Sequence, residues 1–167
     1  EVTDGVFRVI DKALGISYIL KVVNRPLYQP RDTEVMEKEL ENLEEFKGVP
    51  GIVQAAGLAV STDPYTTSMK DGQRWIISGV LLEYYGGGSL QHILDEQRMK
   101  DLPWERWPIQ IGTALHRFHM AKKTHMDLKP SNVVIDGDGN AIMIDVSGIG
   151  GITHQWLAPE IRSEISP

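Results

Sequence analysis

The stretch His125–Asn132 (HMDLKPSN) and the acid that follows it, Asp145, limit the possible folds more than any other part of this sequence. Asp127 and Asn132 share one loop, whereas Asp145 ends a predicted strand after the Asp136–Gly139 segment, which is typical of a β-hairpin turn. Mg²⁺ prefers oxygen ligands, and Asn132 and Asp145 can supply them. Asp127 is then left to orient a hydroxyl group or to accept its proton. The pattern therefore predicts a nucleotide–metal site.

Lys129 adds a positive charge to the same loop. A cation in that place can neutralise charge on a phosphoryl group during its transfer. Two nearby acids, Asp136 and Asp138, are better explained as turn residues than as metal ligands. His116 and His119 lie in a predicted helix and are interpreted as packing residues.

The first half of the chain predicts strands separated by one helix. The predicted strands, rich in β-branched and aromatic residues, are Val6–Asp11, Ile16–Val23, Ile52–Val60 and Trp75–Tyr84. The helix begins at Asp32 or Thr33 and ends before Gly48–Gly51. Glu39 recurs at helical spacing with apolar residues, so it is expected on the apolar face of this helix, with Met36, Leu43 and Phe46.

The second half begins with three glycines, Gly86–Gly88, which we interpret as a flexible connection between two lobes. A helix is predicted over Trp104–Met120, and two short strands over Val133–Ile135 and Ala141–Ile144. The chain is therefore expected to be an α+β protein. Residues 1–85 would form an N-terminal unit and residues 86–167 a second unit.

Composition excludes several classes of function. The net charge is −6 and no basic block stands out, so nucleic acid is not an expected partner. No apolar run reaches the roughly 18–20 residues of a membrane span, and the N-terminus lacks the pattern of a signal peptide. The absence of cysteine excludes disulfides and thiolate metal sites. A cytoplasmic location is the expectation that follows.

The motifs of this chain strongly resemble those of protein kinases. That family carries a catalytic loop H-R-D-L-x-x-x-N, a metal-binding D-F-G, a strand lysine in V-A-I-K and a closing A-P-E. The matching segments here are HMDLKPSN, Asp145–Ser147, Tyr18–Lys21 and an unchanged Ala158–Glu160. Leu81–Tyr85 is similar to the hinge between kinase lobes, and Lys129–Pro130 resembles the serine/threonine branch. The resemblance covers nearly the whole chain and implies a two-lobed protein-kinase-like fold.

The resemblance also implies ATP as the cofactor and a set of residues that would bind it. Lys21 would hold the inner phosphates, and Glu39 would be its ion-pair partner. Leu82 would sit at the gatekeeper position. The backbones of Glu83 and Tyr85 would meet the adenine edge. Val134 is a further cofactor-site residue by the same resemblance.

The remaining implied roles concern metal and catalysis. Asn132 and Asp145 would hold Mg²⁺. Asp127 would be the catalytic base, and Lys129 would steady the transferred phosphate.

Several departures from the family pattern bear on activity. Only Gly5 can match the glycine-rich loop, so the first strand and most of that loop are expected to be missing. Met126 replaces an arginine that usually pairs with a phosphate, and Val146 replaces a phenylalanine. The activation segment is short, so phosphorylation is not expected to activate the protein, although Ser147 and Thr153 are present.

The end of the chain departs further from the family. Few residues follow Glu160, so the C-terminal helices of the large lobe are also expected to be missing. Their loss would leave apolar surface that something must cover. The expected cover is a second copy of the chain, giving a homodimer, or another protein partner.

Three functions remain open from the sequence. The first is a serine/threonine kinase-like module that is weak or inactive as this shortened chain, with a binding or regulatory role. The second is an active serine/threonine protein kinase, with a protein substrate, in a longer chain or assembly. The third is a small-molecule phosphotransferase of kinase-like fold, against which Lys129–Pro130 and Ala158–Glu160 argue.

Overall fold

The computed structural model describes residues 5–22, 30–62, 75–149 and 153–165. The chain divides into two compact units: Glu1–Met36 with Gln54–Tyr84, and Glu37–Val53 with Tyr85–Pro167. The division into two domains after residue 85 stays a prediction. In the structure, the segment Glu37–Val53 belongs to the same compact unit as Tyr85–Pro167. Among the described residues, no helix is long and apolar enough to cross a bilayer.

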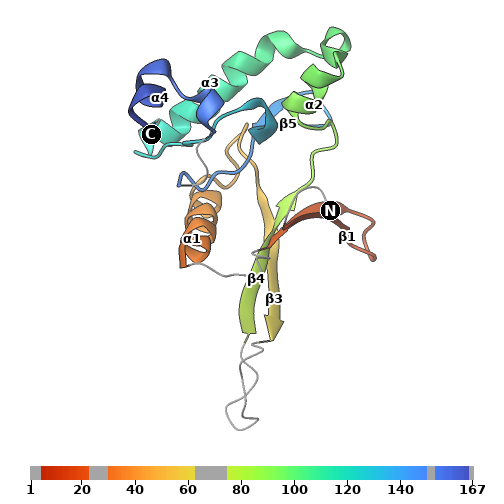
Figure 1. Ribbon diagram of the computed structural model, residues 1–167. Coiled ribbons are helices and arrows are strands. Elements are labelled where there is room, and N and C mark those ends of the chain that lie inside the picture. Colours follow the sequence, from red (N-terminus) through yellow and green to blue (C-terminus); the bar gives the residue numbers. More distant parts are fainter. Residues whose placement is uncertain (1–4, 23–29, 63–74, 150–152, 166–167) are drawn as a thin grey trace. The chain divides into compact units, whose positions relative to one another are not determined.

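The first unit is built on an antiparallel sheet with strand order β1-β2-β4-β3 (Figure 1). The strands are β1 (Val6–Ile10), β2 (Ser17–Val22), β3 (Ala55–Thr62) and β4 (Trp75–Glu83). Asp11 closes the β1–β2 turn, since its carboxylate accepts hydrogen bonds from the N–H groups of Ala13 and Leu14. Gly79 is required where β2 meets β4, because a Cβ there would lie 2.5 Å from the carbonyl oxygen of Lys21.

One predicted strand begins later than its sequence suggests. The apolar run Ile52–Val60 predicts a single strand, but β3 begins at Ala55. Ile52 instead forms a parallel bridge with Met143, and the N–H of Val53 donates to the Met143 carbonyl at 2.9 Å. The predicted strand is therefore wrong at its start, because Ile52 and Val53 are buried in the second unit rather than in the sheet.

Helix α1 spans Pro30–Glu45, so it begins two or three residues before its predicted start at Asp32 or Thr33. From Glu37 onward the helix belongs to the second unit. Beyond its last turn the Phe46 ring stacks on Phe118 with a centroid distance of 4.3 Å. Both rings are buried, so this contact fixes the end of α1 on the core of the second unit.

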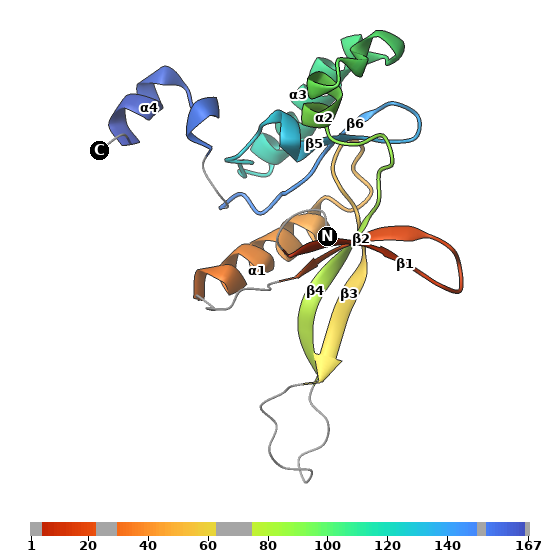
Figure 2. The same ribbon diagram turned by 45° about the vertical axis from the view of Figure 1, so that its right-hand side comes forward.

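The rest of the second unit is mainly helical (Figure 2). Its elements are α2 (Leu90–Asp95), α3 (Trp107–Met120), the antiparallel pair β5 (Val133–Ile135) and β6 (Ala141–Met143), and α4 (Pro159–Ile165). One core cluster is formed by buried side chains of these elements: Ile93, Trp107, Val133, Ile135 and Ala141. The predicted helix 104–120 divides in two, since a 3-10 turn precedes α3 and Pro108 stands in the first turn of α3.

Two of the three glycines before α2, Gly87 and Gly88, are held in place. Gly87 donates its N–H to the Ile135 carbonyl, and the Ile135 N–H donates to the Gly88 carbonyl, both at 2.9 Å. A Cβ at Gly87 would lie 2.5 Å from the same Ile135 oxygen. The structure therefore does not support a flexible connection at Gly87 and Gly88, which follow the course of β5 closely.

Candidate active site

The loop His125–Asn132 is anchored on the segment that leads to Asp145. The His125 ring is buried, and its Nε2 atom lies 2.8 Å from the Ile144 carbonyl oxygen. The N–H of Ile144 donates in turn to the Asn132 carbonyl at 3.0 Å. These two contacts hold both ends of the loop beside the residue that directly precedes Asp145.

Asp127 is the centre of a hydrogen-bond network in which both carboxylate oxygens take part. Its Oδ2 accepts from Lys129 Nζ at 2.7 Å and from Asn132 Nδ2 at 3.2 Å. Its Oδ1 accepts from the hydroxyl and the N–H of Thr153, at 2.7 and 3.2 Å. Lys129 Nζ also donates to the Thr153 hydroxyl at 2.7 Å. The structure thus brings together three predicted site residues, Asp127, Lys129 and Asn132, around one carboxylate.

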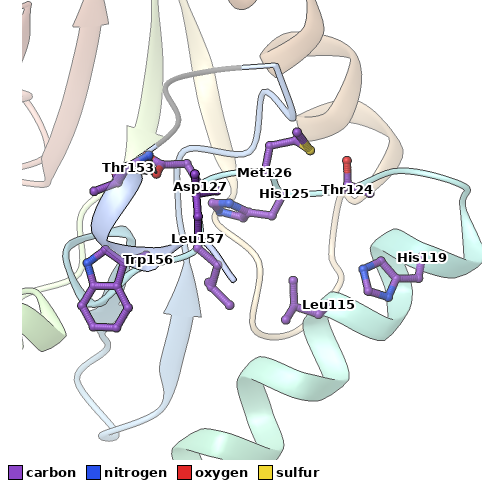
Figure 3. Close-up of a pocket in the computed structure, with 10 residues that line it drawn as sticks. Leu115, His119, Thr124, His125, Met126, Asp127, Thr153, Trp156 and Leu157 are labelled. Atoms are coloured by element: carbon purple, nitrogen blue, oxygen red, sulfur yellow. Dashed lines mark hydrogen bonds between the residues drawn. The ribbon is translucent and has the colours of Figure 1, made fainter. Parts of the chain in front are cut away.

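Thr153 is the residue of this network that the sequence did not predict. In the sequence it is only a hydroxyl residue of a segment that phosphorylation is not expected to activate, and it lies 26 residues from Asp127 along the chain. Figure 3 shows Thr153 beside Asp127, with Trp156 and Leu157 further along the same segment. Together with α3 and the loop His125–Asn132, this segment lines an open pocket of about 260 Å³ to which Asp127 contributes.

The environment of Asp127 sets its charge. Burial alone raises the pKa of this carboxyl, but the hydrogen bonds from Lys129 and Thr153 and the Lys129 charge outweigh burial, so the pKa lies below its ordinary value of 3.8. Asp127 is therefore ionised at neutral pH. Because the folded-state pKa is lowered, Asp127 contributes stability that is complete above the ordinary value and is lost as the pH falls through the folded-state pKa.

Replacing Thr153 by valine should move acid unfolding to higher pH. The variant loses the hydroxyl that donates to Asp127, so the pKa of Asp127 rises and less of the linked stability remains in acid. The measurement is the pH midpoint of unfolding, followed by circular dichroism. Thr113→Val is the matched control, since it removes an exposed hydroxyl that donates to the Ile109 carbonyl within α3. Equal midpoints for the two variants would contradict the role of Thr153.

Asn132 and Asp145 fit a Mg²⁺ site in their chemistry. The Asn132 side-chain nitrogen donates to Asp127, so its oxygen is the atom that can serve a cation. Asp145 has φ = 61°, an uncommon backbone conformation that local contacts must hold. The described residues contain no group of three or more His, Asp or Glu that could hold a metal. A site with two protein ligands is nevertheless normal for Mg²⁺, which keeps waters and binds substrate phosphates.

The residues predicted to bind the nucleotide fall in both units. Lys21 pairs with Val80 across β2 and β4, and Leu82 is buried in β4 opposite Ile19. The Glu83 N–H donates to the Gln54 carbonyl at 3.0 Å, so Glu83 could meet adenine only through its carbonyl. These residues of the first unit form no described site by themselves.

Three further predicted residues lie in the second unit. Glu39 is 2% exposed, in agreement with its expected place on the apolar face of α1. Val134 is half-buried in β5 and bridges to Ser89, and Tyr85 opens the segment before the glycines. The Lys21–Glu39 ion pair and the adenine contacts remain predictions, because they join residues of different units.

The reading of Asp136 as a turn residue is confirmed. Its carboxylate accepts hydrogen bonds from the N–H groups of Asp138 and Asn140 and from the Asn140 side chain. Burial raises the pKa of Asp136, but these bonds outweigh burial and the pKa is lowered. Both carboxylate oxygens of Asp136 therefore take part in closing the β5–β6 turn.

An ionised aspartate held by a lysine and an asparagine, with a second aspartate after a hairpin, is the arrangement expected of a phosphotransferase. The sequence comparison agrees, since the protein kinase domain model matches residues 3–163. The chain belongs to the protein kinase domain family. The predicted family membership and the α+β kinase-like fold are thus confirmed.

Curated relatives are similar to this chain at low identity. Sporulation-specific protein 1 of Saccharomyces cerevisiae is 25% identical over 93% of this chain and 32% of its own length. Serine/threonine-protein kinase 4 homolog A of Dictyostelium discoideum is 25% identical over 97% of this chain and 35% of its own length. Serine/threonine-protein kinase KIC1 of S. cerevisiae is 25% identical over 96% of this chain and 15% of its own length. The chain therefore spans about a third or less of the relatives' lengths.

Proposed function

We propose that this chain supplies the site for Mg²⁺-ATP-dependent transfer of a phosphoryl group to a serine or threonine hydroxyl of a protein. The observation that carries the proposal is the Asp127 carboxylate, ionised and held on both oxygens by Lys129, Asn132 and Thr153. Such pre-organisation is what phosphoryl transfer requires, because positioning and electrostatics supply most of its catalysis. The similarity to two serine/threonine kinases supports the substrate class.

Three residues of the loop, and Asp145 after it, each have a task in this proposal. Asp127 orients the attacking hydroxyl and receives its proton as the new bond to the γ-phosphorus forms, while the bond from that phosphorus to the bridging oxygen breaks and ADP leaves. Lys129 places its ammonium group against the oxygens of the transferred phosphoryl group. Asn132 and Asp145 would hold Mg²⁺, which when bound neutralises charge on the phosphates.

A second candidate is a kinase-like module that binds a protein without catalysis. Met126 and Val146 favour it, because Met126 is 52% exposed and offers no charge for a phosphate, and Val146 is fully buried but small. A homodimer or another protein partner is part of this candidate, and light scattering would give the mass of the assembly. For either candidate, the substrates and partners of the full-length protein are part of the proposal.

Calorimetry with ATP and a phosphotransfer assay separate the two candidates. The wild-type chain is titrated with ATP with and without Mg²⁺, and is then incubated with labelled ATP and a mixed serine/threonine peptide library. Metal-dependent binding with transfer to peptide supports the kinase. Absence of binding at millimolar ATP would overturn the proposed catalysis and leave the binding module.

A further inference from the structure

The side chain of Asn42 lies buried at the contact between α1 and the loop that follows Asp145. It is 4% exposed, in the part of α1 that belongs to the second unit. Its Nδ2 atom donates to the backbone carbonyl of Val146 at 2.6 Å and to that of Ser147 at 3.3 Å. An amide in such a place is costly to bury unless its polar atoms are bonded. Here it is bonded to backbone carbonyls that follow a predicted metal ligand.

The oxygen of the same amide is bonded to a lysine. Lys123 Nζ donates to Asn42 Oδ1 at 2.5 Å and forms an ion pair with Glu45 at the same distance. Lys123 lies shortly after the end of α3 at Met120, and its N–H donates to the Phe118 carbonyl at 2.9 Å. A positive donor on Oδ1 polarises the amide and strengthens the hydrogen bonds that its nitrogen donates. Asn42 thus joins α1, the end of α3 and the loop 146–148.

The loop between Asp145 and Gly148 needs such support. Asp145 and Gly148 have φ values of 61° and 72°, so two left-handed residues flank Val146 and Ser147. A non-glycine residue in this conformation is strained and persists only where its surroundings hold it. On its other side the loop meets Thr124, since a Cβ at Gly148 would lie 2.7 Å from the Thr124 carbonyl oxygen. The loop is therefore fixed between Thr124 and Asn42.

We propose that Asn42 is a positioning residue for Asp145, acting through the carbonyls of Val146 and Ser147. It keeps the strained backbone in the conformation that presents the Asp145 carboxylate to Mg²⁺, and Lys123 links this conformation to α1. Asn42 itself touches neither metal nor nucleotide. The role of Asp145 as a metal ligand rests on the proposed function. The stabilisation of the loop by the hydrogen bonds of Asn42 does not depend on that function.

Asn42→Leu tests this role, because leucine fills similar space and favours the helix but donates no hydrogen bond. Hydrogen exchange should rise about tenfold in residues 144–149, as expected for loss of a buried hydrogen bond, and stay unchanged in β5 and β6. The dissociation constant of ATP with Mg²⁺ should rise about tenfold, while that of metal-free ATP stays within about twofold. Asn42→Asp should change hydrogen exchange and ATP binding in the same way as Asn42→Leu. Its carboxylate can accept a hydrogen bond from Lys123 but cannot donate one to the carbonyls of Val146 and Ser147.

Glu45→Gln is the matched control, because it weakens the Lys123 ion pair and leaves the amide in place. It should change neither exchange nor ATP binding by more than about twofold. A general rise in exchange that includes β5 and β6, together with weaker metal-free ATP binding, would overturn positioning and leave a structural role. If the wild type binds no Mg²⁺-ATP, the proposed function fails. The exchange data then still decide, since a rise confined to the loop supports the hold by Asn42 and no rise overturns it.

Discussion

Replacing Asp145 by asparagine is expected to abolish the Mg²⁺-dependent part of ATP binding. The change removes the charged ligand but keeps the shape of the side chain. Asparagine also tolerates the left-handed backbone that Asp145 adopts, so the loop is not strained further. The loss of affinity with Mg²⁺ should exceed the roughly 10–100-fold that removal of an outer-shell partner costs at a metal site. Calorimetry with and without Mg²⁺ measures it directly.

The control for this variant is Asp138→Asn. Asp138 is exposed in the β5–β6 turn, so its change removes the same charge from the same unit without touching the site. Metal-free ATP should bind wild type and both variants alike. An Asp145→Asn chain that still binds ATP more tightly with Mg²⁺ would show that another group holds the metal.

The second large effect is expected for Asp127→Asn, in the rate of transfer rather than in binding. Asparagine has one acceptor oxygen, so it can keep the hydrogen bond from Lys129 or those from Thr153 but not both. It also cannot receive the proton of the attacking hydroxyl. Loss of a general base lowers the rate by about 100- to 10,000-fold. The affinity for Mg²⁺-ATP should stay within about threefold of wild type, because Asp127 is not a metal ligand in the proposed site.

Glu41→Gln provides the matched control for Asp127→Asn. It also changes an acid to an amide next to a lysine, since Glu41 pairs with Lys38 at 2.7 Å on the exposed face of α1. Its rate should equal that of wild type, because an exposed pair of this kind contributes little. A fall in ATP affinity as large as the fall in rate would mean that Asp127 acts mainly by shaping the nucleotide site.

The sequence predicted the secondary structure well wherever one local signal decided it. Strands β1, β2 and β4 lie within one or two residues of their predictions, because β-branched residues and turn residues mark both ends. Helix α1 was found from the spacing of its apolar face. The start of β3 was wrong because Ile52 and Val53 have the same apolar character whichever element they pack against. Their partner, Met143, lies far along the chain and cannot be inferred from periodicity.

The site shows the same limit. Asp127, Lys129 and Asn132 lie on one short loop, so their spacing alone predicted that they meet. Thr153 lies 26 residues from Asp127 along the chain, and no local pattern indicates that the two side chains meet. Asn42 could not be predicted either, because its nitrogen bonds to backbone carbonyls, which leave no mark on the sequence at positions 146 and 147.

The way the second unit combines two distant segments has a consequence for synthesis of the protein. Asn42 and Val146 are 104 residues apart in the chain. Phe46 likewise packs against Phe118, a residue that is synthesised much later. At a translation rate of about 5–20 residues per second, Asn42 leaves the ribosome roughly 5–20 s before its partner. Until Phe118 has been synthesised, the side chains of Leu43 and Phe46, at the end of α1, have no core to enter. The nascent chain should therefore depend on chaperone binding to this helix, which ribosome-associated crosslinking at Phe46 could detect.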